Sequence, residues 1–401
     1  MTPDAIALCV PNIGEAERAN LNACIDTGYV SSVGPFVSEF EARIGAAMGV
    51  DRAVATGSGT QALHLALYVA GVQRGDLVVM PAFTFIATAN ACWQAGASPL
   101  LLDIEPEGWT LDPEALRGLF EEDCDRTAAG LVHRASGRRI GAVMPVYTLG
   151  NVARMREIDA LAQAAGVPLV ADAAAALGST YEGGTQAEIA DLSCRSFNGN
   201  KIVTSGCGGA VFGRQRDWMT RARHVASTAR QGADYDHDQP AFNYRMSNTD
   251  AAVGCAQMDR LGRFIDVKRQ VRAAYNALAA SRSYVAGFPE APWGRSNCWF
   301  SGLVFNQQGA GAADVAALRA DLAVHGIEAR PFWKPVHLQQ PYADSPTGRL
   351  ERTNALWSRV VTLPCSTGIT AAELDRCSDV VASALARLEK AGSSSGLPRT
   401  E

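Results

Sequence analysis

The sequence has 401 residues, of which 47% are apolar and 19% are charged. Such a chain is too long for one simple core and too apolar to be disordered, so two globular domains are expected. Its 36 basic and 41 acidic residues leave a net charge of -5, and no block of like charge stands out. This charge pattern argues against a nucleic-acid partner.

The cysteines and the N-terminus indicate the compartment. Ten cysteines lie between Cys9 and Cys377 without a C-x-x-C pair, and the six histidines show no metal-ligand spacing beside them. This pattern favours a reducing environment and no metal site. No basic N-terminal region precedes an apolar core, and no apolar run approaches the ~20 residues of a membrane span. We therefore expect a cytoplasmic protein that does not bind a membrane.

The first half of the chain predicts alternating helices and strands. Two helices are expected over residues 14–28 and 36–48, from apolar positions at helical spacing. Short apolar runs and helical stretches then alternate along the chain. Strands are predicted over residues 76–81, 97–103, 139–147 and 167–172, and helices from about Ile86 and over 155–165. This alternation is typical of an α/β fold with a mostly parallel sheet covered by helices, whose ligands bind beyond the strand carboxyl ends.

The signals change after about Asp250. Long helical stretches are predicted around residues 251–278, 312–325 and 371–390, with less regular sequence between them. We interpret residues 1–250 as a large domain and residues 251–390 as a smaller α+β domain. Residues 391–401 are small and polar, which predicts a disordered tail.

Lys201 is the first candidate for catalytic chemistry. It stands in S-F-N-G-N-K, residues 196–201, between a strand-like run and a glycine-rich return, and the chain has only four lysines. Pyridoxal phosphate (PLP) chemistry needs an amine that forms a Schiff base and later acts as a general base. The alternative is a surface lysine in a hairpin.

Other segments supply the remaining parts of a PLP site. Asp172 ends the apolar run V-P-L-V-A-D, where a carboxylate could pair with a pyridine nitrogen or could instead cap a helix. Ser58, Gly59 and Thr60 open an amphipathic helix, a position that suits a phosphate but also suits ordinary caps. Phe85, after the next strand, could lie over a cofactor ring or could belong to the core.

Together and in this order, these segments resemble the sugar aminotransferases of the DegT/DnrJ/EryC1/StrS family, from about Pro11 to about Leu388. The motifs that carry the resemblance are G-P-F-V-S-E-F-E, G-S-G-T-Q-A-L-H-L-A-L, P-A-F-T-F-I-A-T-A-N-A, S-F-N-G-N-K, N-Y-R-M-S-N-T-D-A-A-V-G and R-P-F-W-K-P-V-H-L-Q-Q-P-Y. The resemblance implies the type I, aspartate-aminotransferase-like PLP fold.

The resemblance also assigns roles to single residues. It implies that Lys201 is the Schiff-base lysine, that Asp172 pairs with the pyridinium, and that the Ser196 hydroxyl meets the phosphate. Phe85 would stack on PLP, and Asn243 would reach the phosphate of the neighbouring subunit. A homodimer with shared active sites is therefore expected.

Within the family, the segments S-F-N-G-N-K, W-G-R-S-N-C-W-F and S-G-R-R-I-G-A-V-M-P-V are most similar to the branch that aminates C4 of UDP-linked 4-keto-6-deoxy-N-acetylhexosamines. It departs from the family where Ala175 replaces the usual Gln or Glu, where Tyr147 replaces a frequent His, and where Cys207 replaces Glu or Gly. Loss of the polar group at position 175 removes a neighbour of the cofactor ring. Retention of Lys201 argues against the family's dehydratases, which carry histidine there.

The resemblance implies ping-pong transfer of an amino group from L-glutamate to the keto carbon, C4, of a nucleotide-linked keto-sugar, with Lys201 moving the proton. The diphosphate needs cationic and hydrogen-bonding partners, for which the candidates are Arg295, Asn297, Lys334 and His337, each of which could also be an ordinary surface residue. Two alternatives stay open. One is a PLP enzyme that catalyses a different reaction, such as a dehydratase or lyase. The other is a catalytically silent homologue that binds PLP or a sugar nucleotide as a regulator.

Overall fold

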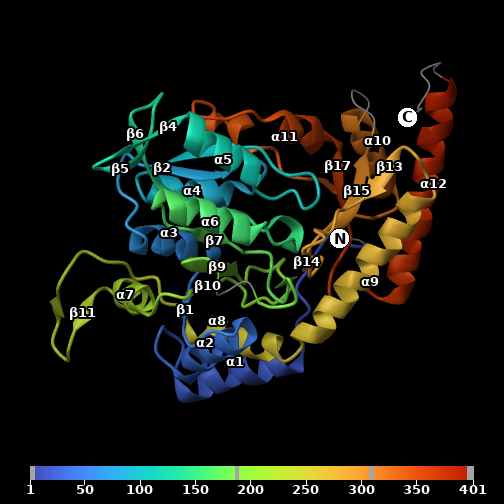
Figure 1. Ribbon diagram of the computed structural model, residues 1–401. Helices are drawn as coiled ribbons and strands as arrows, with labels where there is room; N and C mark the ends of the chain where they lie inside the picture. Colours follow the sequence, from blue (N-terminus) through green and yellow to red (C-terminus); the bar gives the residue numbers. More distant parts are fainter. Residues whose placement is uncertain (1–4, 186–188, 307–310, 395–401) are drawn as a thin grey trace.

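The computed structural model describes residues 5–185, 189–306 and 311–394 (Figure 1). Its α-helices are α1 (Glu15–Thr27), α2 (Pro35–Met48), α3 (Gly59–Val69), α4 (Ile86–Gln94), α5 (Pro113–Glu122), α6 (Met155–Ala165), α7 (Arg216–Ala226), α8 (Asn248–Met258), α9 (Leu261–Ala280), α10 (Gly311–Val324), α11 (Glu351–Leu356) and α12 (Ala371–Ser394). The strands of the first part are β1 (Ala53–Thr56), β2 (Leu77–Pro81), β3 (Ser98–Leu102), β4 (Cys124–Thr127), β5 (Gly130–His133), β6 (Arg138–Val143), β7 (Val170–Asp172), β8 (Thr180–Tyr181), β9 (Leu192–Ser196), β10 (Gly209–Phe212), β11 (Arg230–Gln231) and β12 (Asp236–His237). The later strands are β13 (Val285–Gly287), β14 (Gly294–Arg295), β15 (Ser301–Phe305), β16 (Arg330–Pro331) and β17 (Val360–Leu363).

A central sheet with the order β3-β2-β6-β7-β9-β10-β1 forms the first part of the molecule. The pairs β3/β2, β2/β6 and β7/β9 are parallel, and parallel bridges at Val143/Leu169 and Val146/Asp172 join β6 to β7. Among these strands β10 runs against its neighbours β9 and β1. The prediction of a mostly parallel sheet is confirmed. The β4–β5 hairpin, which extends the sheet beside β6, was not predicted.

Helices cover both faces of this sheet because its strands are apolar on both sides. In β2, Val78 and Met80 pack in one cluster with residues of α3, α4 and α7. Leu77 and Val79 point the other way and pack with residues of α5 and α6. The two-residue period of a strand thus distributes one apolar run between two cores.

A second, antiparallel sheet with the order β13-β15-β17-β16 lies in the C-terminal part, where α9, α10 and α12 gather around it (Figure 1). The expectation of one helical stretch over residues 251–278 is wrong, because α8 ends at Met258 and α9 begins at Leu261. The break lets α8 pack on α1 and α2 while α9 packs on β13 and β15. Between the helices, Arg260 forms an ion pair with the buried Glu17 of α1.

Each of the two parts of the molecule is contacted by a segment of the chain that belongs, by sequence, to the other part. Ile6 pairs with Ile327, and Cys365 N donates to Leu8 O at 2.7 Å, so the N-terminal segment lies with the C-terminal sheet. In the other direction, Val336 N donates to the backbone oxygen of Ala82 at the end of β2. The division at residue 250 therefore stays a prediction.

Helix α12 continues four residues past the predicted tail boundary, and residues 395–401 of that tail lie outside the described residues.

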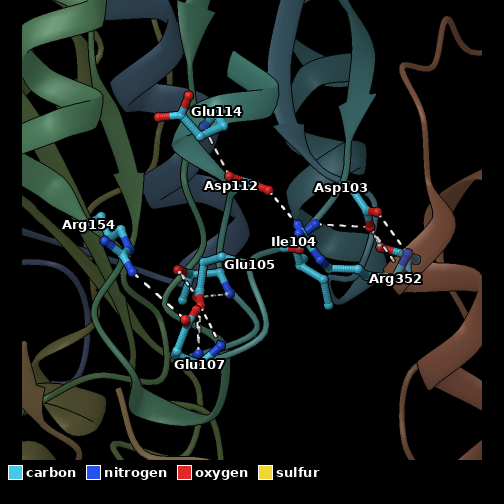
Figure 2. Close-up of polar contacts among 11 residues, drawn as sticks. Asp103, Ile104, Glu105, Glu107, Asp112, Glu114, Arg154 and Arg352 are labelled. Atoms are coloured by element: carbon cyan, nitrogen blue, oxygen red, sulfur yellow. Dashed lines mark hydrogen bonds and ion pairs between the residues drawn. The ribbon is translucent and has the colours of Figure 1, made fainter. Parts of the chain in front are cut away.

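Hydrogen bonds and ion pairs order the loop after β3 and join it to the start of α11 (Figure 2). The buried Glu105 carboxylate accepts hydrogen bonds from the backbone of residues 107, 108 and 110 and from the Thr110 hydroxyl. Asp103 accepts from the backbone N–H groups of Arg352 and Thr353 at the start of α11. These bonds hold Trp109, at a φ of 60°, in the core within 5.9 Å of the Phe83 ring.

Candidate active site

A cavity of about 270 Å³ lies beyond the carboxyl ends of β2, β6, β7 and β9. Parallel sheets place ligands at this edge. Its walls come from seven stretches of the chain, and the residues that line it are Ser58, Gly59, Thr60, Leu63, Thr84, Phe85, Ala87, Thr88, Val146, Tyr147, Asp172, Ala174, Ala175, Ser196, Asn198, Asn200, Lys201, Cys207, Gly208, Trp299, Phe300 and Trp333. The cavity thus brings together Ser58, Gly59, Thr60, Phe85, Asp172, Ser196 and Lys201.

Lys201 is half-buried in the loop after β9, where its backbone N–H donates to Asn198 O at 2.9 Å. Burial lowers the pKa of its amine to about 8, and nearby Lys268 acts in the same direction, whereas Asp172 and Cys9 oppose the shift. A lysine whose pKa lies near 8 has a sizeable neutral fraction at neutral pH, which a general base or a nucleophile needs. This environment is not that of a surface lysine in a hairpin.

Trp299 is a site residue that sequence reasoning missed. Lys201 Nζ lies 3.6 Å from the centroid of the Trp299 ring, and Trp299 Nε1 donates to Asn200 O at 2.7 Å. The indole therefore holds both the charged group of Lys201 and the peptide that precedes it. An ammonium over an aromatic face is stabilised by the ring quadrupole. The motif W-G-R-S-N-C-W-F carried this residue, but only the tertiary fold brings it under Lys201.

Asp172 ends β7 with a buried carboxylate. Thr88 Oγ1 donates to its Oδ2 at 2.7 Å, and Ala174 N donates to its Oδ1 at 3.1 Å. Burial raises the pKa of Asp172, while these two bonds and the positive charge of Lys201 oppose the shift. The alternative role as a helix cap is wrong, because residues 173–178 form turns and no helix begins there.

The start of α3 and the end of β9 meet closely enough to form a phosphate cradle. The Ser58 hydroxyl accepts from Gln61 N at 3.1 Å and caps α3, so the capping interpretation is confirmed. Gly59 and Thr60 lie in the first turn, where N–H groups have no acceptor within the helix. A Cβ added at Gly59 would stand 2.7 Å from Ser196 Cβ, so only glycine permits this approach.

The residues present therefore fit PLP. A phosphate would meet the positive end of α3 and the Ser196 hydroxyl. The Asp172 carboxylate suits a protonated ring nitrogen, and the Lys201 amine suits the aldehyde. Phe85 is 53% exposed, lines the cavity and lies 5.8 Å from the Trp333 ring, so the core interpretation of Phe85 is wrong. Ala175 also lines the cavity, where it offers no polar side chain.

Other predicted site residues lie outside this cavity. Asn243 is exposed in a segment that runs beside Ser227, so its reach to a neighbouring subunit stays a prediction. Arg295 on β14 and Lys334 after β16 are also exposed. His337 is half-buried, and its Nε2 lies 2.9 Å from Asn354 Oδ1.

Asn297, by contrast, is fully buried, and its side-chain amide forms hydrogen bonds with backbone groups. Its Nδ2 donates to the carbonyl oxygens of Ala175 and Leu177, each at 2.8 Å, and its Oδ1 accepts from Trp299 N at 3.0 Å. Every polar atom of its side chain is thus engaged within the protein. Asn297 fixes two walls of the cavity, and the geometry favours this role over contact with a substrate.

Two general features bear on the class of protein. Among the described residues, no group of three or more His, Cys, Asp or Glu side chains is placed to hold a metal ion. None of the helices described combines the length and the apolar character needed to cross a membrane.

The fold and the cavity define a PLP-dependent enzyme of the type I class, and comparisons with known proteins give the family. The model of the DegT/DnrJ/EryC1/StrS aminotransferase family matches residues 11–382, and the chain belongs to this family. The Bacillus subtilis (strain 168) protein EpsN, named as a pyridoxal phosphate-dependent aminotransferase, is 34% identical over 94% of this chain and 95% of its own length. A GDP-perosamine synthase of Caulobacter vibrioides is 33% identical over 92% of this chain and 96% of its own length. The crystal structure of DesI in the presence of its TDP-sugar product is 26% identical, covers 97% of this chain and 95% of that chain, and superposes with a TM-score of 0.84.

These comparisons confirm the predicted family, fold class and cofactor. The protein is a PLP-dependent sugar aminotransferase. The roles of its individual residues and its particular acceptor remain proposals.

Proposed function

We propose that the enzyme moves an amino group from L-glutamate to the keto carbon, C4, of a nucleotide-linked keto-sugar in two half-reactions. One observation carries this proposal: Lys201, Asp172 and the start of α3 line a single cavity, and aromatic rings line it with them. Trp299 stacks on Phe300 at 4.1 Å between centroids and lies 5.9 Å from the Trp333 ring. Flat apolar rings suit the faces of a sugar.

Apart from Lys201, none of the described residues that line the cavity is cationic. The ring of a keto-sugar carries no charge and needs no cationic partner there, whereas the carboxylates of L-glutamate need partners from outside this lining. The nucleotide diphosphate would extend beyond the cavity, where Arg295 and Lys334 stay the candidates for its charge.

Each residue has a defined task in this proposal. Lys201 takes the proton from the reacting carbon of the donor and returns a proton to the acceptor carbon, and its pKa of about 8 suits both directions. Asp172, fixed by Thr88 and Ala174, holds the cofactor's ring nitrogen. Bound PLP supplies the electron sink that makes the carbon-bound proton acidic.

The finer proposal for the acceptor is UDP-2-acetamido-2,6-dideoxy-hexos-4-ulose. It rests on the similarity of S-F-N-G-N-K, W-G-R-S-N-C-W-F and S-G-R-R-I-G-A-V-M-P-V to the branch that aminates such sugars. The relatives carry other nucleotides in their names, GDP in the Caulobacter synthase and TDP in the DesI complex. The nucleotide is therefore the variable to test.

The test is a panel of UDP-, GDP- and TDP-linked 3-keto and 4-keto sugars, incubated with PLP-loaded enzyme and L-glutamate. We expect 2-oxoglutarate release and a product whose mass shows a keto oxygen replaced by an amine, with the UDP 4-keto sugar turned over fastest. The control is the Lys201→Ala variant, which should yield neither product.

Other outcomes identify the alternatives. A sugar product without new nitrogen would indicate a dehydratase. The absence of 2-oxoglutarate with every sugar would contradict the transfer itself and favour a silent homologue. A faster reaction with a GDP or TDP sugar would overturn only the finer proposal.

A further inference from the structure

Two cysteines and a lysine form a cluster behind the Lys201 loop, and the reaction described above does not use them. Cys9 belongs to the N-terminal segment, and Cys365 follows β17 at the point where its backbone N–H donates to Leu8 O. Lys268 on α9 points between them. Residues from three distant parts of the sequence therefore meet at one place.

The Lys268 ammonium is fully buried. Its Nζ lies 2.8 Å from Trp299 O, 3.5 Å from Cys9 Sγ and 3.8 Å from Cys365 Sγ. Among the described residues, no carboxylate forms an ion pair with it. A buried charge without a counter-charge is costly, so an anion beside Lys268 is strongly favoured.

Cys9 can supply that anion. The hydrogen bond from Cys365 lowers the pKa of the Cys9 thiol to about 6, and the charges of Lys268 and Lys201 act in the same direction against the effect of burial. The pKa of Cys365 is raised well above its usual value by the bond to Cys9 and by burial. With these pKa values Cys9 is a thiolate at neutral pH and Cys365 is a protonated thiol, and both sulfurs lie within 3.8 Å of Lys268 Nζ.

Cys9 is the more accessible of the two cysteines, although neither of them itself lines the neighbouring cavity among the described residues. Cys9 is half-buried, whereas Cys365 is fully buried. A cavity of about 510 Å³ is lined by residues on both sides of Cys9 and by Ser366, the residue after Cys365. Cysteines with a stable, accessible thiolate and a second thiol within reach are the ones that oxidants convert reversibly to disulfides.

We propose that Cys9 and Cys365 form a hydroperoxide-sensitive thiol pair that closes to a disulfide. The Cys9 thiolate attacks one peroxide oxygen, the O–O bond breaks, and hydroxide leaves and takes up a proton. The sulfur is thereby oxidised by two electrons to a sulfenic acid, and the peroxide is reduced. Cys365 then loses its proton and attacks the Cys9 sulfur, so that the S–S bond forms, the S–O bond breaks and water leaves. Overall, two thiols and one hydrogen peroxide give one disulfide and two waters.

The Cys9–Cys365 pair affects Lys201 in two ways, through a hydrogen bond and through its charge. Cys9 Sγ lies 3.3 Å from Asn200 O, the carbonyl directly before Lys201. The negative charge of Cys9 also raises the pKa of Lys201, whereas the charge of Lys268 lowers it. Disulfide formation removes the thiolate and leaves Lys268, so oxidation lowers the pKa of Lys201.

The first experiment treats the cofactor-free and PLP-loaded enzyme with hydrogen peroxide at pH 7 and maps the peptides by mass spectrometry without reduction. We expect a Cys9–Cys365 disulfide in most molecules, and its reversal by dithiothreitol. With the same treatment, Cys365→Ser should accumulate the sulfenic acid of Cys9, which dimedone traps, because the resolving thiol is gone.

Cys207→Ser serves as the matched control, since Cys207 is exposed and is the only cysteine among the described residues that line the active-site cavity. The Cys9–Cys365 disulfide should form equally in this variant. Wild-type protein that reacts first at Cys207 and leaves Cys9 and Cys365 reduced would overturn the proposal, and a covalent link between Cys9 and Lys268 would overturn it as well.

Two measurements on unmutated protein keep the proposal testable if a cysteine variant folds poorly. Alkylation of Cys9 should rise with pH through a midpoint near pH 6, as set by Lys268 of α9, Cys365 after β17 and Lys201 after β9. Amine labelling of Lys201 in the cofactor-free protein should move to lower pH after oxidation. A Cys9 midpoint near 9, or an unchanged Lys201 midpoint in fully oxidised protein, would contradict the mechanism.

Discussion

Replacing Trp299 by leucine should lower the pKa of Lys201. The half-buried Lys201 places its ammonium 3.6 Å from the centroid of the ring of Trp299, which is itself buried. A cation over a desolvated ring is stabilised by about 1–2 kcal/mol, and 1.36 kcal/mol corresponds to a factor of ten in a proton equilibrium. Loss of the ring destabilises only the charged form, so the pKa should fall from about 8 to about 7.

The assay is competitive labelling of the cofactor-free protein with acetic anhydride across pH, with modified Lys201 quantified by peptide mass spectrometry. Labelling requires the neutral amine, so its midpoint reports the pKa. Trp299→Phe keeps an aromatic face but loses the indole bond to Asn200 O, and it should shift the midpoint less than Trp299→Leu does.

Trp293 offers a matched control for the same experiment. Arg154 lies 4.3 Å from the Trp293 ring centroid, and Trp293 Nε1 donates to Val152 O at 2.7 Å, but the residue lies outside the cavity. Trp293→Leu should leave the Lys201 midpoint unchanged. Equal shifts for the two tryptophan variants, or no shift for Trp299→Leu, would refute the cation–π argument.

The remaining predictions concern the carboxylate, the buried amide and the assembly. Asp172→Asn should retain PLP, seen by absorbance, but lose about 100-fold or more in kcat, because breaking a buried charge pair costs about 3–5 kcal/mol; near-normal turnover would mean that another group holds the ring. Asn297→Ala should lower the free energy of unfolding by about 2–4 kcal/mol, since two buried carbonyls lose their donors; unchanged thermal stability with a raised KM would restore its predicted role in substrate binding. If Asn243 completes the partner's site in a two-fold dimer, inactive Lys201→Ala and Asn243→Asp proteins should recover about a quarter of wild-type activity when co-refolded, and proven heterodimers without activity would exclude shared sites.

The local sequence determined much of this protein. Apolar runs between helical stretches predicted the covered parallel sheet, because buried strands and amphipathic helices each leave a distinct period. Motifs placed Lys201 and Asp172 at strand ends, where the sheet brings them to one edge. The break between α8 and α9 escaped this reasoning, because the helical period continues through Asp259 and Arg260 while their ion pairs to Arg43 and Glu17 are long-range.

Only the tertiary structure decided how the site is supported. Trp299 lies 98 residues beyond Lys201 in the sequence, and Lys268 lies 259 residues from Cys9 and 97 from Cys365, so no spacing along the chain indicates that they meet. The polar amide of Asn297 suggested a ligand-binding residue, yet the fold surrounds it with backbone carbonyls. The sequence shows which chemical groups are available, whereas burial and distance determine their charge, their partners and their tasks, because desolvation and electrostatic interaction depend on three-dimensional position.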